Sequence, residues 1–224
     1  MAGEAPFQPA RQVCYWGQPV ALVVAASFEQ ARNAAKHLRL EWRAEDAPLD
    51  PTTAETEENE STRVGDLAHA MAEAAHSVDV VITTEGHASA AMEPHAALAQ
   101  WDGKTLTVHA SLQMLKFNRA ELADTLNLDE SQVRLLSPYV GGGFGSKLGV
   151  SQEVVAASLA AMQLGRPVRV VMSRQQVFQT IMRRSETHQR IRLAADADGK
   201  LTGFGHEARV SNLPGEDFAE PVLQ

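Results

Sequence analysis

The sequence predicts an α+β fold, in which mixed sheets pack against helices and a small strand–helix–strand unit precedes a larger domain. Short apolar runs bounded by glycine, proline or polar residues recur along the chain and indicate strands. Longer stretches carry apolar residues at helical spacing. An acidic segment with two prolines separates the two parts, so we expect a partial domain over residues 1–60 and a second over residues 61–224.

The first part is predicted to be a strand, a helix and a second strand. Residues 18–25 form an apolar run typical of a buried strand. Ser27 then has the character of an N-cap, with Gln30 at the capping-box position ahead of apolar residues at helical spacing up to Leu38. Residues 38–43 alternate and predict the second strand. Such a unit is too small to stand alone.

The segment from Asp46 to Ser61 is the predicted boundary. It carries Pro48, Pro51 and four glutamates, with few residues that could be buried. This composition favours a solvated linker over a functional acidic patch.

The second part alternates strands with helices. Its longest helix, over residues 151–164, has Val154, Val155, Leu159 and Met162 on one predicted face and ends at Gly165. Strands are expected at residues 77–84, 96–101, 105–111, 133–136, 168–172, 188–194 and 201–210, and shorter helices at 118–126 and 175–182.

Composition restricts the function classes. The chain has 224 residues, 44% of them hydrophobic and 21% charged, as expected of a globular protein. A net charge of −8 argues against a nucleic-acid or anionic-membrane partner, because both require clustered lysine and arginine. The apolar run at 19–26 is too short to span a bilayer and lacks the charged region of a signal peptide, so we expect no membrane insertion.

Cysteine usage excludes several kinds of site. Cys14 is the only cysteine, so the chain cannot form an internal disulfide or supply by itself a cysteine-ligated zinc or iron–sulfur site. An apolar pattern resumes just before Gln224 without a cap or polar tail. We interpret the chain as a segment of a larger polypeptide.

The run Ser-Pro-Tyr-Val-Gly-Gly-Gly-Phe-Gly-Ser-Lys-Leu over residues 137–148 has the most distinctive composition. Glycines allow φ > 0 and close approach of a ligand, and N–H groups at the start of a helix attract anions. The run is not a P-loop, because Ser146 precedes Lys147 and Leu148 follows it. It is not a dinucleotide fingerprint either, since Ser146 occupies the place of the third glycine. A tight turn and an anion-binding loop both remain open.

Four segments in order resemble one family. They are Gly17-Gln-Pro-Val-Ala-Leu-Val-Val-Ala25, Met92-Glu-Pro-His-Ala96, residues 101–113 and Gly141-Gly-Gly-Phe-Gly145. Together they are similar to the molybdenum-binding subunits of the xanthine dehydrogenase and aldehyde oxidase family, and most similar to the bacterial periplasmic aldehyde oxidoreductases. The resemblance covers nearly the whole chain.

The resemblance implies a molybdopterin cofactor, in bacteria usually as the cytosine dinucleotide, and a second domain that is the first part of the molybdopterin-binding domain. It also implies that the first domain is part of an α/β hammerhead-like domain. Gln113 matches the glutamine that hydrogen-bonds an oxygen ligand of molybdenum, while Gly143, Phe144 and Gly145 match the loop whose backbone contacts the cofactor. An amide can donate a hydrogen bond without adding charge, and glycine-loop N–H groups suit an anion. A strand-end glutamine facing water is the other interpretation of Gln113.

Leu148 bears on the substrate. Purine-oxidising members of the family have a glutamate at this position, and a leucine offers only apolar surface, which favours aldehydes. A core residue in the first turn of the following helix is the other interpretation. The family's catalytic glutamate lies near the far C-terminus of the complete subunit, so no catalytic residue is assigned. Glu93 is interpreted as fixing its turn, and His95 as a packed or surface histidine rather than a metal ligand.

The sequence therefore predicts part of a molybdenum hydroxylase that oxidises aldehydes to carboxylic acids with water as the oxygen source, inactive in isolation. [2Fe-2S] clusters and FAD are expected on an iron–sulfur subunit and an FAD subunit. A non-catalytic assembly module of the same fold, purine oxidation and an unrelated nucleotide-binding α/β domain are the alternatives. Export to the bacterial periplasm with a partner subunit, or a cytoplasmic location, would both fit.

Overall fold

The structure is a computed structural model that describes residues 12–46, 56 and 61–211. The chain forms two compact units, and each unit is assembled from segments that are separated in the sequence. One contains the N-terminal segment up to Glu41 and residues Ala88–Arg183, and the other combines Trp42–His87 with Arg184–Ser211. Helices and sheets occur in both units, and the four-stranded sheet contains parallel and antiparallel pairs, which confirms the predicted α+β class. The predicted linker falls almost wholly outside the described residues.

The first unit is built on a four-stranded sheet with the order β5-β4-β3-β6. The strands are β3 (Ala96–Trp101), β4 (Leu106–Ala110), β5 (Val133–Leu136) and β6 (Val168–Val171). β3 pairs antiparallel with β4 and β6, and β4 pairs in parallel with β5. The strands predicted at 96–101 and 105–111 are thus confirmed, and they form a hairpin with its turn at Asp102.

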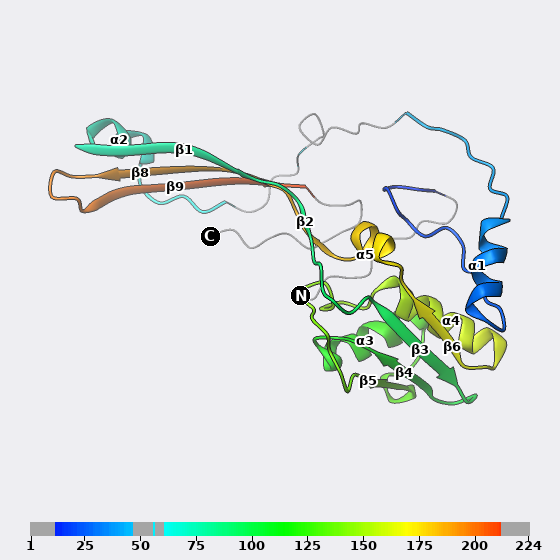
Figure 1. Ribbon diagram of the computed structural model, residues 1–224. Coiled ribbons are helices and arrows are strands. Elements are labelled where there is room, and N and C mark those ends of the chain that lie inside the picture. The colour runs from blue at the N-terminus through cyan, green and yellow to red at the C-terminus, as the bar shows by residue number, and fades with distance from the viewer. Residues whose placement is uncertain (1–11, 47–55, 57–60, 212–224) are drawn as a thin grey trace. The chain divides into compact units, whose positions relative to one another are not determined.

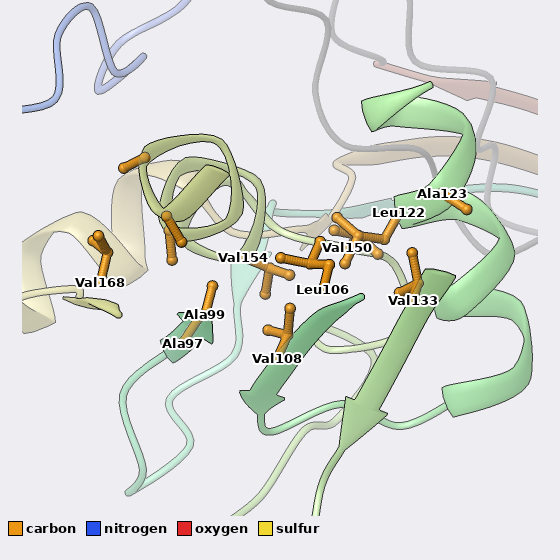
Figure 2. Close-up of a cluster of buried hydrophobic side chains, with 13 residues drawn as sticks. Ala97, Ala99, Leu106, Val108, Leu122, Ala123, Val133, Val150, Val154 and Val168 are labelled. Carbon is orange, nitrogen blue, oxygen red and sulfur yellow. The ribbon is translucent and has the colours of Figure 1, made fainter. Parts of the chain in front are cut away.

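Two helices contribute to the core of this unit. α4 (Gln152–Leu164) packs against β3, β4 and β6, and α3 (Leu115–Leu126) packs against β5. Figure 2 shows Leu106 and Val108 of β4 beside Val154 of α4, with Leu122 of α3 and Val133 of β5 next to them. These side chains are 0–4% exposed, so the sheet and both helices share one hydrophobic core.

The buried face of α4 agrees in part with the predicted one, since Val154 is buried and Val155 and Met162 pack against the core. Leu159 is 45% exposed, whereas Ala157 and Ala161 are fully buried. The helix lies against β3, whose inward side chains are Ala97 and Ala99. Small side chains on both elements let helix and strand approach closely, so the alanines rather than the leucine face the sheet.

The N-terminal segment contains the predicted helix but neither predicted strand. α1 (Phe28–Lys36) begins after Ser27, whose hydroxyl accepts a hydrogen bond from the Gln30 amide at 3.3 Å. The strands expected at 18–25 and 38–43 were wrong, because neither stretch is paired in a sheet. Apolar side chains such as Val20 and Leu40 are 47–48% exposed. A strand requires a neighbour for its N–H and C=O groups, and no described segment pairs with these two.

The second unit is a long three-stranded antiparallel sheet of order β1-β8-β9, seen in Figure 1. Its strands are β1 (His76–Thr84), β8 (Thr187–Ala195) and β9 (Leu201–Val210). α2 (Leu67–Glu73) covers one face, where a Cβ at Gly203 would meet Ala70 and Leu67. The opposite face carries Val78, Val80, Ile82 and Phe204, which are 41–53% exposed.

The other elements in the described ranges are α5 (Arg174–Thr180), the 3₁₀ turn η1 (Glu130–Gln132), and the paired short strands β2 (His87–Ala88) and β7 (Arg183–Arg184). No helix within the described ranges has the length and apolar character needed to cross a bilayer.

Candidate functional site

The glycine loop connects β5 to α4 and has an unusual backbone. Gly142, Phe144 and Gly145 adopt φ values of 100°, 52° and 93°. A positive φ is uncommon for a bulky residue and is retained where the surroundings impose it. The Phe144 side chain is 71% exposed, so core packing does not account for this conformation. The loop holds an exposed aromatic in a strained backbone position.

Gln113 holds the far end of this loop with both its backbone and its side chain. Its amide oxygen Oε1 accepts from the Gly145 N–H at 3.1 Å and from the Lys147 N–H at 3.2 Å. Its own N–H donates to the Lys147 carbonyl oxygen at 2.8 Å. Because Oε1 is used twice, the amide NH₂ group is directed away from these donors, and it has no hydrogen-bond partner among residues 12–46 and 61–211. Gln113 is exposed, so this NH₂ group is available to a ligand.

Gly143 permits the contact between the loop and Gln113. A Cβ placed at Gly143 would overlap the Oε1 and Cδ atoms of Gln113. The backbone of Gly143 does not have a positive φ, so the requirement for glycine here is close approach rather than conformation. Gly141 is similar, since a Cβ there would lie 2.6 Å from the Cβ of Glu93.

Three successive backbone donors of the loop are not used within the described part of the chain. The N–H groups of Gly141, Gly145, Ser146, Lys147 and Leu148 all donate to loop or neighbouring acceptors. Those of Gly142, Gly143 and Phe144 make no hydrogen bond to another described residue. Successive free N–H groups in a loop with positive φ values are typical of an anion-binding concavity.

An ion pair between a buried lysine and a partly exposed glutamate supports the loop from the other side. Lys147 Nζ, which is 0% exposed, donates to Glu93 Oε2 at 2.7 Å and to Ser111 Oγ at 3.1 Å. Glu93 Oε2 also accepts from Ser111 Oγ and from the Gly141 N–H, both at 2.7 Å. Burial acts to raise the pKa of Glu93, but the hydrogen bonds from these donors outweigh it and hold the pKa below its usual value. Glu93 is therefore a poor proton acceptor and, as predicted, fixes its turn.

The turn that carries Glu93 is itself held by Arg174 of α5. The Arg174 guanidinium donates to the carbonyl oxygens of Ala91 at 2.7 Å and Met92 at 2.9 Å. Arg174 also lies over the Phe178 ring, at 5.7 Å from its centroid. The sequence gives no local signal for these contacts, because more than 80 residues separate donor and acceptor.

His95 and Glu153 lie buried close to the loop's end. His95 is 1% exposed and its Nε2 lies 3.0 Å from the Ser146 carbonyl oxygen, which agrees with the predicted packed histidine. Glu153, in the first turn of α4, accepts from Ser151 Oγ at 2.7 Å. Burial raises the pKa of Glu153, and that hydrogen bond only partly offsets the effect. No group of three or more His, Cys, Asp or Glu side chains in the described ranges could hold a metal ion.

Leu148 follows directly on this network. It is half-buried, precedes the N-cap Ser151 of α4, and is absent from the hydrophobic core. Its carbonyl oxygen accepts from Asn118 Nδ2 at 2.6 Å, which fixes the backbone while leaving the side chain partly exposed. The structure thus brings Gln113, Gly143, Phe144, Gly145 and Leu148 together in one loop region of the first unit.

Residues 50–224 match the molybdopterin cofactor-binding domain family, which is more than half of the chain. The chain belongs to this family. The curated relatives include the aldehyde oxidoreductase molybdenum-binding subunit PaoC of Escherichia coli K12, which is 40% identical over 207 residues. The aligned region is 90% of this chain and 28% of that protein. The gamma subunit of the 6-hydroxypseudooxynicotine dehydrogenase complex of Paenarthrobacter nicotinovorans is 33% identical over 95% of this chain and 28% of its own length.

The fold agrees with solved structures. Aldehyde oxidoreductase from Desulfovibrio gigas superposes with a TM-score of 0.76, covering 93% of this chain and 27% of that one at 21% identity. At this identity the likeness establishes the fold alone. The chain spans little more than a quarter of the length of these two curated relatives.

Proposed function

We propose that the chain is part of the molybdenum-binding subunit of a molybdenum hydroxylase that oxidises aldehydes to carboxylic acids, with water as the oxygen source. The observation that carries the proposal is the junction of Gln113 with the glycine loop. At this junction the exposed Gln113 provides an NH₂ donor, and the loop provides three unused backbone N–H groups on successive residues.

These groups fit an anionic molybdenum–pterin cofactor. The backbone N–H groups of Gly142, Gly143 and Phe144 would donate hydrogen bonds to an anionic group, and the Gln113 NH₂ would donate to an oxygen ligand of the metal without adding charge. The absence of a side chain at Gly143 leaves room for the loop to lie against Gln113. Such a cofactor, when bound, supplies the two-electron oxidation. We propose its cytosine dinucleotide form.

The donor pattern adds one detail to the expectation for Gly145. Its N–H is already bonded to Gln113 at 3.1 Å. We therefore assign Gly145 the role of aligning Gln113, and propose that direct backbone contact with the cofactor is made by Gly142, Gly143 and Phe144.

We assign aldehyde specificity to Leu148. The side chain is half-buried beside the loop and can contact substrate only through apolar atoms, whereas a carboxylate there would bind a polar heterocycle. Replacing Leu148 by Glu in the complete enzyme should lower kcat/KM for an aldehyde and raise it for a purine. If the preference between the two substrates stays unchanged, the assignment is wrong.

We propose that the catalytic base of the reaction is none of the residues assigned to this site. Glu93 Oε2 already accepts three hydrogen bonds and its pKa is lowered, which argues against a role as base. Electrons would leave through [2Fe-2S] and FAD partner subunits, which accords with a single cysteine in this chain. For a complex of this kind we propose the bacterial periplasm, with export carried by a partner subunit.

Metal analysis and cofactor extraction of the complete complex test the proposal. We expect molybdenum and a pterin in the wild type, and a preparation with neither would refute it. Gln113→Glu keeps an acceptor for the Gly145 and Lys147 N–H groups but removes the NH₂ donor. We expect this variant to keep its thermal midpoint and lose about tenfold or more in kcat for aldehydes. Exposed Gln100→Glu on β3 is the matched control and should leave kcat unchanged.

A further inference from the structure

Lys147 is an unusual residue to find wholly buried. Its side chain is 0% exposed, and its ammonium contacts Glu93 Oε2 at 2.7 Å and Ser111 Oγ at 3.1 Å. Removing the Lys147 ammonium from water carries a desolvation cost, although the Glu93 side chain stays 35% exposed, and an apolar residue of similar volume is often as stabilising. Stability alone is therefore a weak reason for an ion pair at this place.

The pair occupies a particular position relative to the loop. At the first residue of the Gly141–Lys147 segment, Glu93 Oε2 accepts from the Gly141 N–H at 2.7 Å, and the Glu93 N–H donates to the Gly141 carbonyl at 3.3 Å. The last residue is Lys147, whose ammonium pairs with Glu93. The backbone N–H and C=O of Lys147 both form hydrogen bonds with Gln113. One ion pair thus joins the two ends of the segment.

The unused N–H groups lie between these two ends. Gly142, Gly143 and Phe144 occupy the middle of the segment, while its ends are held by Glu93 and Gln113. A change in the separation of the ends would move the free donors together. Residues that hydrogen-bond to the groups contacting a metal site, without contacting it themselves, matter for that site. Their mutation typically lowers metal affinity or activity by about 10- to 100-fold.

We propose that Glu93 and Lys147 form a positioning pair, whose hydrogen-bonded charges set the separation of Gly141 and Lys147 and so hold the loop in the conformation that retains the cofactor. This inference rests on the proposed function. It gives the pair no contact with substrate and no role in proton transfer. Ser111, which bonds to both members, would orient the pair.

The test compares single and double neutral variants of the complete complex. Lys147→Met and Glu93→Gln each leave an unpaired partner, whereas the double variant Glu93→Gln/Lys147→Met leaves no unpaired charge. The exposed pair of Arg119 and Glu130, 2.8 Å apart, offers the control Arg119→Met/Glu130→Gln with the same change of charge types. Molybdenum per subunit, thermal midpoint, and kcat and KM for an aldehyde are measured for each variant.

We expect the single variants to lose both thermal stability and molybdenum. The double variant should recover a thermal midpoint near that of the wild type, yet still contain about tenfold less molybdenum. In its loaded fraction kcat should fall while KM changes little, because substrate is not contacted. Ser111→Ala, which creates no unpaired charge, should fall between wild type and the double variant. The control should match the wild type in every measurement.

A double variant with wild-type molybdenum content and kcat would overturn the inference, since the pair would then serve folding alone. Wild-type behaviour of Ser111→Ala together with full metal content in both single variants would overturn it as well. A wild-type complex without molybdenum would instead refute the proposed function. The two failures are thereby distinguishable.

Discussion

The glycine loop and the three-stranded sheet β1-β8-β9 differ in where their side chains find partners. Around the loop, the buried charge of Lys147 and the strained backbone near Phe144 are held by residues of the same unit. On the sheet, apolar side chains at alternate positions, including Val80 and Phe204, are 41–53% exposed opposite the face that α2 covers. The sequence pattern thus shows which side chains are charged or apolar, but it does not show which residue each of them contacts in the folded chain.

The largest expected effect is the difference in free energy of unfolding between truncating a core leucine and truncating a surface leucine. Leu106 is 0% exposed in the core of the first unit, whereas Leu201 of β9 is 63% exposed. We expect Leu106→Ala to lower the free energy of unfolding by about 2–5 kcal/mol, because it leaves a cavity between sheet and helices. Leu201→Ala should change it by less than about 0.5 kcal/mol. Urea unfolding of both variants measures the difference, and equal losses would contradict the assignment of the core.

A methyl group at Gly143 should disturb the loop directly. Gly143→Ala would displace Gln113 from the Gly145 and Lys147 N–H groups, and we expect a loss of about 1–3 kcal/mol in the free energy of unfolding. Gly165→Asn is the control, since Gly165 has free space around it and a left-handed C-cap conformation that asparagine tolerates. Chemical denaturation should show a clearly smaller loss for the control.

Glu153 gives a prediction about pH. Because its pKa is raised by burial, the folded protein binds more protons than the unfolded chain between the ordinary glutamate pKa of 4.5 and the raised value. Stability conferred by the neutral form therefore declines as the pH rises through this window. Glu153→Gln should remove that decline and raise the thermal midpoint at neutral pH, with little effect at pH values below the ordinary glutamate pKa. Exposed Glu73→Gln serves as the control; a lower midpoint for Glu153→Gln at neutral pH would contradict the argument.

The smallest effect is expected on the exposed sheet face. Val80→Thr on β1, where the side chain is 41% exposed, should change the free energy of unfolding by less than about 0.5 kcal/mol. The same substitution at Val108 of β4 buries a hydroxyl at a site with 0% exposure and should cost about 1–3 kcal/mol. Thermal unfolding of the pair compares the two faces under identical chemistry, and similar shifts would mean that the sheet face is covered in solution.

The elements within residues 88–183 were largely predictable because their signals are local. The turn at Asp102 and the stop at Gly165 delimit strand and helix, and both recur in the structure. The strands expected at 18–25 and 38–43 failed because apolar alternation cannot supply the neighbouring strand that ladder bonding needs. The short helix α2 was missed, since seven residues with only the Asp66 cap give little periodicity.

The candidate site was predictable in part. The loop and Gln113 stood out through composition and through a family resemblance covering several segments. The contacts behind them did not, because Glu93 and Lys147 lie 54 positions apart and Arg174 reaches a turn more than 80 positions earlier. From the sequence alone, a lysine in a glycine-rich run is expected to be exposed. Only the three-dimensional structure places its ammonium out of solvent with a carboxylate and a hydroxyl.

The most direct test of the central claim is the molybdenum and pterin content of the complete complex, compared between the wild type and Gly143→Ala, with Gly165→Asn as control. If the loop and Gln113 form one wall of the cofactor site, wild type and control carry equimolar molybdenum and pterin, and Gly143→Ala carries about tenfold less of both. A wild type that lacks molybdenum, or a Gly143→Ala variant that retains the full amount, would contradict the account.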